Sequence, residues 1–147
     1  MRITTKGRYA LRATVALAQM GSDDEKISVN TLSETEDISS VFLEQIFFKL
    51  KKAGIVTSAR GPGGGFAFAR ALDSITVREI FDAAGEEMTV LPCDRSKNKC
   101  ERRSECISHE VFESVTGVVN NYLGSLSLKT VLESDTFNPR AVKKARS

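Results

Sequence analysis

Apolar positions in the first half of the chain recur at helical spacing, in blocks separated by glycine or polar residues. Residues 8–20 alternate apolar and polar types with a period near 3.6 and stop at Gly21, which is typical of an amphipathic helix. A shorter block at 29–35 predicts a second helix, and residues 37–39 have the composition of a tight turn. The first half is therefore expected to be mainly helical.

The next block, residues 40–53, has two distinct faces when its residues are placed at 100° intervals around a helix. The apolar face consists of Phe42, Leu43, Ile46, Phe47 and Leu50. The opposite face is mostly polar and basic and consists of Ser40, Val41, Glu44, Gln45, Phe48, Lys51 and Lys52. Two helices joined by a short turn, the second with one buried and one polar face, predict a helix-turn-helix.

Four side chains on the polar face are candidates for contacts with base edges or phosphates: Ser40, Glu44, Gln45 and Lys51. Glutamine can bind adenine through two hydrogen bonds, and glutamate can accept one from cytosine N4. Because a carboxylate repels phosphate, Glu44 on this face indicates a role in specificity; the alternative is an ordinary solvated helix residue. Phe48 has two interpretations, contact with a thymine methyl group or a place beneath the hairpin that follows.

A glycine-rich hairpin comes after this helix. Residues 55–60 and 66–69 have the composition of two strands, and the connection between them has almost no side chains. Its backbone can therefore approach another backbone closely. The residues expected to contact DNA here are Arg60, Gly61, Pro62 and Gly63. Beside a helix-turn-helix, such a hairpin predicts a wing; the alternative is an ordinary helical protein with one hairpin.

The second half of the chain predicts a short helix at 76–84, a loop at 92–108 and a long helix at about 109–124. The long helix has a broad apolar stripe made of Ile107, Val111, Phe112, Val115, Val118, Val119, Tyr122 and Leu123. A stripe of this width on a helix outside the main fold needs a partner to cover it, so we expect a symmetric dimer.

The loop holds all three cysteines of the chain, Cys93, Cys100 and Cys106, and the single histidine, His109, follows. An odd number of cysteines argues against a disulfide framework. Thiolates and imidazole are ligands of zinc and of iron–sulfur clusters. Structural zinc sites usually contain cysteine pairs with short gaps, whereas six and five residues separate these cysteines. The spacing favours an iron–sulfur cluster over zinc, or over thiols that act without a metal.

Composition adds few constraints. The chain has 147 residues, of which 27% are charged, and a net charge of +2. The length is typical of one domain with an appendage, and the charged content is ordinary for a globular protein. Because the net charge is small, any basic surface has to be local. No apolar run has the length of a membrane span, and Arg12 interrupts the apolar part of the N-terminal segment, so we expect no signal peptide, no membrane partner and a cytoplasmic location. No nucleotide-binding loop is present, and we expect no enzyme.

Three segments resemble the IscR-type iron–sulfur cluster regulators, which belong to a wider family of bacterial winged-helix repressors. They are MRITTKGRYAL at the N-terminus, FLEQIFFKLKKAGIV in the expected recognition helix and SARGPGGGF in the wing. The resemblance extends over about residues 1–135. It implies a transcription regulator, mostly a repressor, that senses cluster status, iron or oxidative stress. It also implies a homodimer, crossed through the long C-terminal helix, that binds palindromic promoter DNA.

The resemblance further implies that Cys93, Cys100, Cys106 and His109 hold a two-iron, two-sulfur cluster. Nitric-oxide sensors of the same family use an acidic fourth ligand near the N-terminus. Arg8 stands at that place and cannot ligate a metal, which favours the IscR type. The first cysteine gap is one residue longer than the family pattern, so a four-iron cluster in an iron-responsive relative is an alternative, as is a zinc- or thiol-based redox regulator.

The sequence thus predicts a mainly α-helical protein with a small β-hairpin, organised as a winged helix-turn-helix plus a long C-terminal dimerisation helix. We expect a DNA-binding domain at 1–84, a cluster-binding loop at 85–108, a dimerisation region at 109–135 and a disordered tail at 136–147. The expected dimer contacts are Val111, Val115, Val118, Val119 and Tyr122.

Overall fold

A computed structural model describes residues 2–21, 25–91, 100–134 and 136–137. The helices are α1 (Thr5–Met20), α2 (Val29–Glu36), α3 (Ser40–Lys52), α4 (Val77–Ala84), α5 (Ile107–Ser125) and α6 (Leu128–Glu133). The strands β1 (Val56–Ala59) and β2 (Gly65–Phe68) form one antiparallel hairpin, and two 3-10 helices cover Leu72–Ser74 and Arg103–Glu105. The predicted class, mainly helical with a small hairpin, is confirmed. The tail expected to be disordered lies outside the described residues, except for Thr136 and Phe137.

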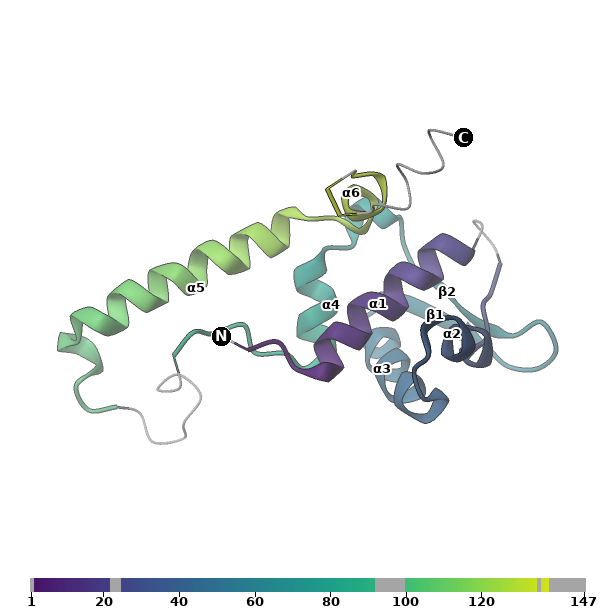
Figure 1. Cartoon of the computed structure of the whole chain (residues 1–147), viewed down its shortest axis with the longest axis horizontal. Coiled ribbons are helices and arrows are strands. Elements are labelled where there is room, and N and C mark those ends of the chain that lie inside the picture. Colours follow the sequence, from purple (N-terminus) through teal and green to yellow (C-terminus); the bar gives the residue numbers. More distant parts are fainter. Residues whose placement is uncertain (1, 22–24, 92–99, 135, 138–147) are drawn as a thin grey trace.

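Helices α1 to α4 surround one hydrophobic core, with the hairpin at one side (Figure 1). The turn between α2 and α3 forms at the predicted place, where Asp37 adopts a left-handed conformation with φ of 51°. The face of α3 predicted to be apolar is largely buried; its buried residues are Leu43, Ile46, Phe47 and Leu50. The helical period of the sequence therefore fixes which side of α3 points outward.

The hairpin is attached to this core through its second strand. Val56 pairs with Phe68 and Ala59 with Gly65, and the backbone of Phe66 also pairs with Ile27. The Phe66 ring lies 4.7 Å, centroid to centroid, from the ring of Phe47 on α3. This aromatic contact fixes the wing against the underside of α3.

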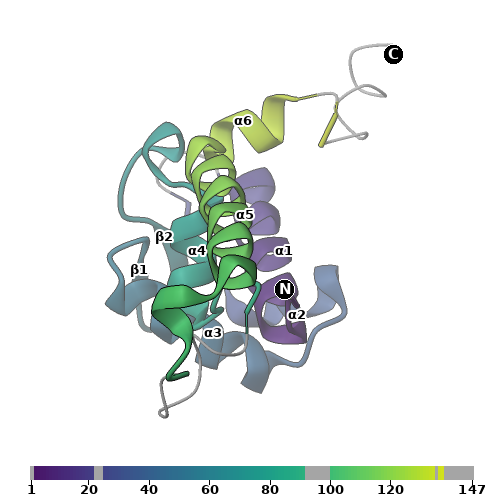
Figure 2. The same ribbon diagram turned by 90° about the vertical axis from the view of Figure 1, so that its left-hand side faces the viewer.

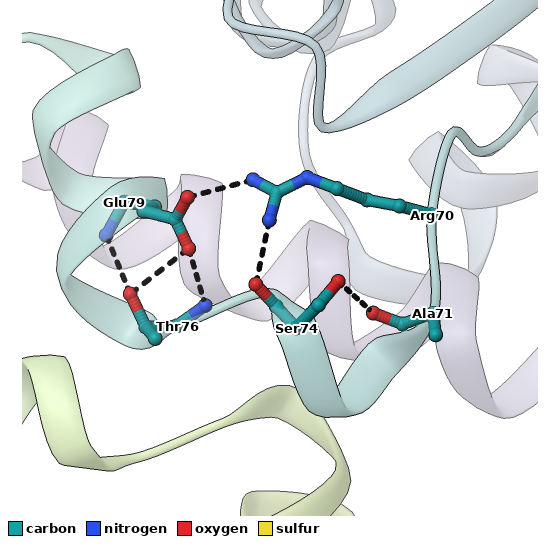
Figure 3. Close-up of polar contacts among 5 residues, drawn as sticks. All are labelled: Arg70, Ala71, Ser74, Thr76 and Glu79. Carbon is teal, nitrogen blue, oxygen red and sulfur yellow. Dashed lines mark hydrogen bonds and ion pairs between the residues drawn. The ribbon is translucent and has the colours of Figure 1, made fainter.

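A polar joint connects the end of the hairpin to the start of α4 (Figure 3). The guanidinium of Arg70 donates to the Ser74 carbonyl oxygen at 2.6 Å and to Glu79 Oε1 at 2.7 Å. Glu79 also closes the capping box of α4, because its Oε2 accepts from the Thr76 backbone nitrogen while its own backbone nitrogen donates to Thr76 Oγ1. Arg70 thus holds the end of the hairpin in position relative to the start of α4.

Helix α5 projects away from this body, and its N-terminal end lies at the side of the molecule opposite the wing (Figure 1). Its C-terminal part packs on α4, where Val119 and Leu123 contact a small cluster formed by Val77, Phe81 and Met88. In Figure 2 the molecule is viewed from that side, nearly along α5, with α4 and α1 behind it.

Helix α6, which the sequence did not predict, returns to the main body. Leu128 is fully buried in the core, and the backbone of Val77 donates to the Leu126 carbonyl oxygen at 2.9 Å. Thr76 and Ser127 form an isolated β-bridge beside this bond. The last part of the expected dimerisation region thus lies against α1 and the 3-10 helix Leu72–Ser74 of the same chain.

Candidate functional site

The outward face of α3 carries Val41, Glu44, Gln45 and Phe48, all exposed. Ser40, the first residue of α3, is only half-exposed. Phe48 is 66% exposed, so its interpretation as a side chain beneath the hairpin is wrong; Phe66 lies there instead, against Phe47. The other sequence candidates on this helix do lie on one solvent-facing surface.

Basic side chains border this face. The last turn of α3 contains Lys49, Lys51 and Lys52. Their positive charges interact favourably with the negative end of the helix dipole. Lys51 Nζ donates to Ser58 Oγ of β1 at 2.7 Å, so the outward face of α3 and the hairpin share a polar contact. Arg60 is exposed directly after β1.

The wing tip is a nearly bare backbone. Gly61 and Gly63 have φ of 88° and 71°, a region that strongly favours glycine. A Cβ at Gly64 would lie 2.5 Å from the Ala59 carbonyl oxygen, so that position has no room for a side chain. Gly61, Pro62 and Gly63 are all exposed, and the tip can therefore approach a flat or grooved surface closely.

The predicted metal ligands lie at the start of α5, except that Cys93 lies outside the described residues. Cys100 and Cys106 are free thiols; Cys100 is exposed and Cys106, half-buried, is the N-cap residue of α5. His109 is only 4% exposed, although it stands on the first turn of a helix that is mostly open to solvent.

The imidazole of His109 makes two contacts through one nitrogen. Arg103 Nε lies 3.1 Å from His109 Nε2, and Glu113 Oε2, one turn further along α5, lies 3.0 Å from the same atom. One ring nitrogen cannot accept a hydrogen bond from Arg103 and donate one to Glu113 at the same time, so Nε2 forms a hydrogen bond with only one of the two. Sequence reasoning identified His109 but did not identify Glu113 as part of its surroundings.

These residues border a cavity of about 380 Å³, lined by Cys100, Glu101, Arg103, Ser104, His109, Glu110 and Glu113. Within the part of the chain that the structure describes, no three histidine, cysteine or acidic side chains are close enough to hold a metal ion. The donor types, two thiols and one imidazole at one helix end, fit a soft metal or an iron–sulfur cluster. They do not by themselves complete a site.

The segment that enters the cysteine loop is bonded to the start of α1 on one side. The buried carboxylate of Glu86 accepts from the backbone nitrogens of Thr4 and Gly7, at 3.2 and 3.0 Å, and also from the Thr4 hydroxyl. A Cβ on Gly7 would lie 2.5 Å from Glu86 Cγ, which explains a glycine inside the first turn of α1. Burial raises the pKa of Glu86, but these hydrogen bonds and the nearby Lys6 outweigh it and hold the pKa below its usual value.

The same segment is bonded to α5 on its other side. The Asn120 amide donates to the Met88 carbonyl oxygen at 3.1 Å, and the Val90 backbone nitrogen donates to Thr116 Oγ1 at 3.1 Å. Residues 86–91 therefore connect three parts: the N-terminus of α1, the middle of α5 and the cysteine loop.

The apolar stripe of α5 is split between two environments. Val119 and Leu123 are half-buried against α4, whereas Ile107 is 82% and Val118 is 67% exposed. The remaining exposed apolar side chains of α5 are Val111, Phe112, Val115 and Tyr122. An uncovered row of this length is typical of a surface that meets another protein chain.

The whole arrangement matches one family of regulators. Residues 3–134 match the Rrf2 family, described as iron-dependent transcriptional regulators. The chain belongs to the Rrf2 family. The transcriptional regulator IscR of Klebsiella pneumoniae is 37% identical over 131 residues, which cover 86% of this chain and 79% of that protein.

Two solved structures share the fold of this Rrf2 protein. The structure of IscR from T. potens has a TM-score of 0.71 with 28% identity and covers 90% of this chain and 87% of its own. The structure of CymR, the global cysteine regulator of B. subtilis, has a TM-score of 0.67 with 26% identity and covers 89% and 95%. The chain is thus an IscR-like, DNA-binding transcription regulator with a winged-helix fold, and not an enzyme.

The described residues contain no helix with both the length and the apolarity needed to span a membrane.

Proposed function

We propose that this Rrf2 protein senses iron–sulfur cluster status through a two-iron, two-sulfur cluster held by Cys93, Cys100, Cys106 and His109. The observation that carries the proposal is the shared cavity of Cys100 and His109, with Cys106 at the start of the same helix, in a chain similar to proteins named IscR. When bound, a cluster supplies a group sensitive to redox state and oxygen, whose presence or absence orders the ligand loop differently.

The proposed output is the affinity of a homodimer for palindromic promoter DNA, mostly as a repressor. Helix α3 lies in the major groove, where Ser40, Glu44 and Gln45 face base edges and Lys51 contacts phosphate. Arg60 and the wing tip contact the backbone beside the groove. The exposed row of α5 forms the dimer contact, with Val111, Val115, Val118 and Tyr122 on the surface and Val119 at its inner edge.

The route from cluster to DNA runs through residues 86–91. This segment leads into the ligand loop, bonds to α5 through Met88 and Val90, and holds the start of α1 through Glu86. Binding or loss of the cluster in the loop would therefore act on α1 through this one segment. Helix α3 packs against α1, so few residues separate the proposed cluster from the proposed DNA contacts.

Anaerobic purification followed by a visible spectrum and by iron and sulfide analysis tests the cluster. A two-iron cluster gives colour with iron and sulfide in equal amounts, about two of each per chain. Alanine at Cys93, Cys100 or Cys106 should abolish stable binding, and the loaded and cluster-free forms should differ in affinity for promoter DNA. A colourless protein that contains zinc, or no metal at all, would contradict the proposal.

A second candidate is a regulator that acts through its thiols without a metal. The free, accessible thiol of Cys100 and the structural similarity to CymR favour it. The two candidates differ in one measurement, because only the thiol regulator keeps full control of DNA binding after iron and sulfide have been removed. In that case oxidant alone would change promoter affinity, and a thiol reductant would restore it.

A further inference from the structure

The outward face of α3 contains two apolar side chains in addition to its polar ones. Val41 is 63% exposed and Phe48 is 66% exposed, and neither belongs to the core beneath the helix. They are seven residues apart, so they lie on the same face, two helical turns from each other. Glu44 and Gln45 stand between them.

The surroundings of this face indicate what covers it. Lys49, Lys51 and Lys52 border its C-terminal end, and Arg60 is exposed at the base of the wing. Positive charge at one end of an elongated helix face is complementary to a polyanion and unfavourable for an apolar protein surface. The chain belongs to a DNA-binding family, so the occupant that fits is duplex DNA.

The major groove offers one exposed apolar group, the C5 methyl of thymine. Valine and phenylalanine cannot form hydrogen bonds with base edges, and they gain little from a groove floor made only of donors and acceptors. Against a thymine methyl, each side chain removes apolar area from water on both partners. Val41 and Phe48 are therefore suited to contact the methyl group of thymine, and they do not distinguish the hydrogen-bonding groups of the neighbouring bases.

We propose that Val41 and Phe48 recognise thymine methyl groups at two positions of each half-site, on either side of the base pairs that Glu44 and Gln45 face. This rests on the proposed function of α3 as the recognition helix. The helix limits the spacing, because seven residues rise about 10 Å, which spans at most about three base-pair steps of 3.4 Å. The two thymines should therefore lie within about three steps of each other along the duplex.

The test uses the intact protein and a duplex that it selects from a random-sequence library. Each thymine of one half-site is replaced in turn by deoxyuridine, which removes only the methyl group and keeps base pairing. Wild-type affinity should fall about fourfold at two positions within about three steps of each other, the effect expected for one buried methyl group each. Replacement at the other thymines should change affinity by less than about twofold.

Two variants assign the positions. Val41→Ala should lose the distinction between thymine and deoxyuridine at one position only, and Phe48→Ala at the other. Both side chains are exposed, so thermal unfolding should match wild type and confirm intact folding. Lys52→Ala is the matched control: it should weaken binding to every duplex and reduce the salt dependence, while both thymine effects remain.

Three results would overturn the proposal. Wild-type protein that is indifferent to every deoxyuridine makes no methyl contact. Thymine effects that survive in both alanine variants belong to other residues, and Val41 and Phe48 then meet a protein partner or solvent. If the library yields no specific duplex, or if Glu44→Ala and Lys51→Ala bind the selected duplex like wild type, the proposed use of α3 itself fails, and this inference with it.

Discussion

Glu113 Oε2 lies 3.0 Å from Nε2 of His109, so a carboxylate on the next turn of α5 holds the buried imidazole. Histidines that bind metals are commonly oriented by a carboxylate on the ring, and loss of that partner costs roughly tenfold to a hundredfold in metal affinity. Glu113→Gln should therefore accelerate loss of the proposed cluster by about that factor. The decay of visible absorbance in the presence of a chelator measures it.

Glu110→Gln is the control for this prediction, because Glu110 lines the same cavity and is exposed. It should lose the cluster at the wild-type rate. Equal rates for all three proteins would show that Glu113 does not orient a ligand. A protein that takes up no cluster at all would instead contradict the proposed function.

The sequence predicted those parts of the structure that depend on local period and composition. The two faces of α3, the turn at Asp37 and the glycine tip of the wing all follow from spacing or from residue types with few allowed conformations. The spacing of the cysteines and the histidine also comes from the chain alone, but the cluster that it predicts stays a prediction. These features involve residues close together in sequence.

The parts that sequence reasoning missed depend on contacts between distant segments. Helix α6 has only six residues, and Leu128 is buried because α1 and the 3-10 helix Leu72–Ser74 lie against it. Glu86 looks like an ordinary polar residue after a helix until the backbone of Gly7 lies beside it. Val118 and Val119 are both apolar positions of the same predicted stripe. Only Val119 is covered, because α4 packs on its side of α5, whereas Val118 is exposed.

Glu86 should make stability depend on pH. Its pKa is lowered in the folded protein, so the ionised carboxylate stabilises the fold above its usual pKa, and that contribution disappears as pH falls through the lowered value. Glu86→Gln should reduce the free energy of unfolding at neutral pH by about 1 to 3 kcal/mol, the range for a hydrogen-bonded buried charge. The difference from wild type should shrink below about pH 4.

Urea unfolding at a series of pH values measures this effect. Glu34→Gln, on the exposed side of α2, is the control and should stay within about 0.5 kcal/mol of wild type at every pH. A difference between Glu86→Gln and wild type that is constant from neutral to acidic pH would mean that shape, and not charge, is what Glu86 contributes.

Arg60 should contribute to DNA affinity equally for every base sequence. It is exposed at the base of the bare wing tip, so contact with a phosphate is its proposed role. Arg60→Ala should weaken specific and nonspecific duplexes to a similar degree and reduce the slope of log affinity against log salt by about one unit. Glu44→Ala should instead change base preference. An unchanged slope for Arg60→Ala would remove Arg60 from the interface.

The exposed row on α5 should control assembly. Val118 is 67% exposed, so a charge there does not disturb the chain's own core but opposes burial against a second copy. Val118→Asp should give folded monomers with weak binding to palindromic DNA, whereas Val118→Leu should remain dimeric. Sedimentation and circular dichroism measure mass and folding together. A Val118→Asp protein of dimer mass and normal affinity would place the contact elsewhere.

The proposed fourth ligand, His109, can be tested by replacing it with cysteine, the residue type of the other three proposed ligands. Imidazole is neutral and donates less charge than a thiolate, and histidine ligation raises the potential of two-iron clusters relative to all-cysteine ones. His109→Cys should therefore yield a more firmly held cluster with a lower midpoint potential. The adjacent Ser108 is exposed on the same turn, so Ser108→Cys adds a thiol without removing the imidazole and should keep the wild-type potential. Redox titration of all three proteins after anaerobic reconstitution decides the point, since equal potentials for wild type and His109→Cys would assign the fourth position to another group.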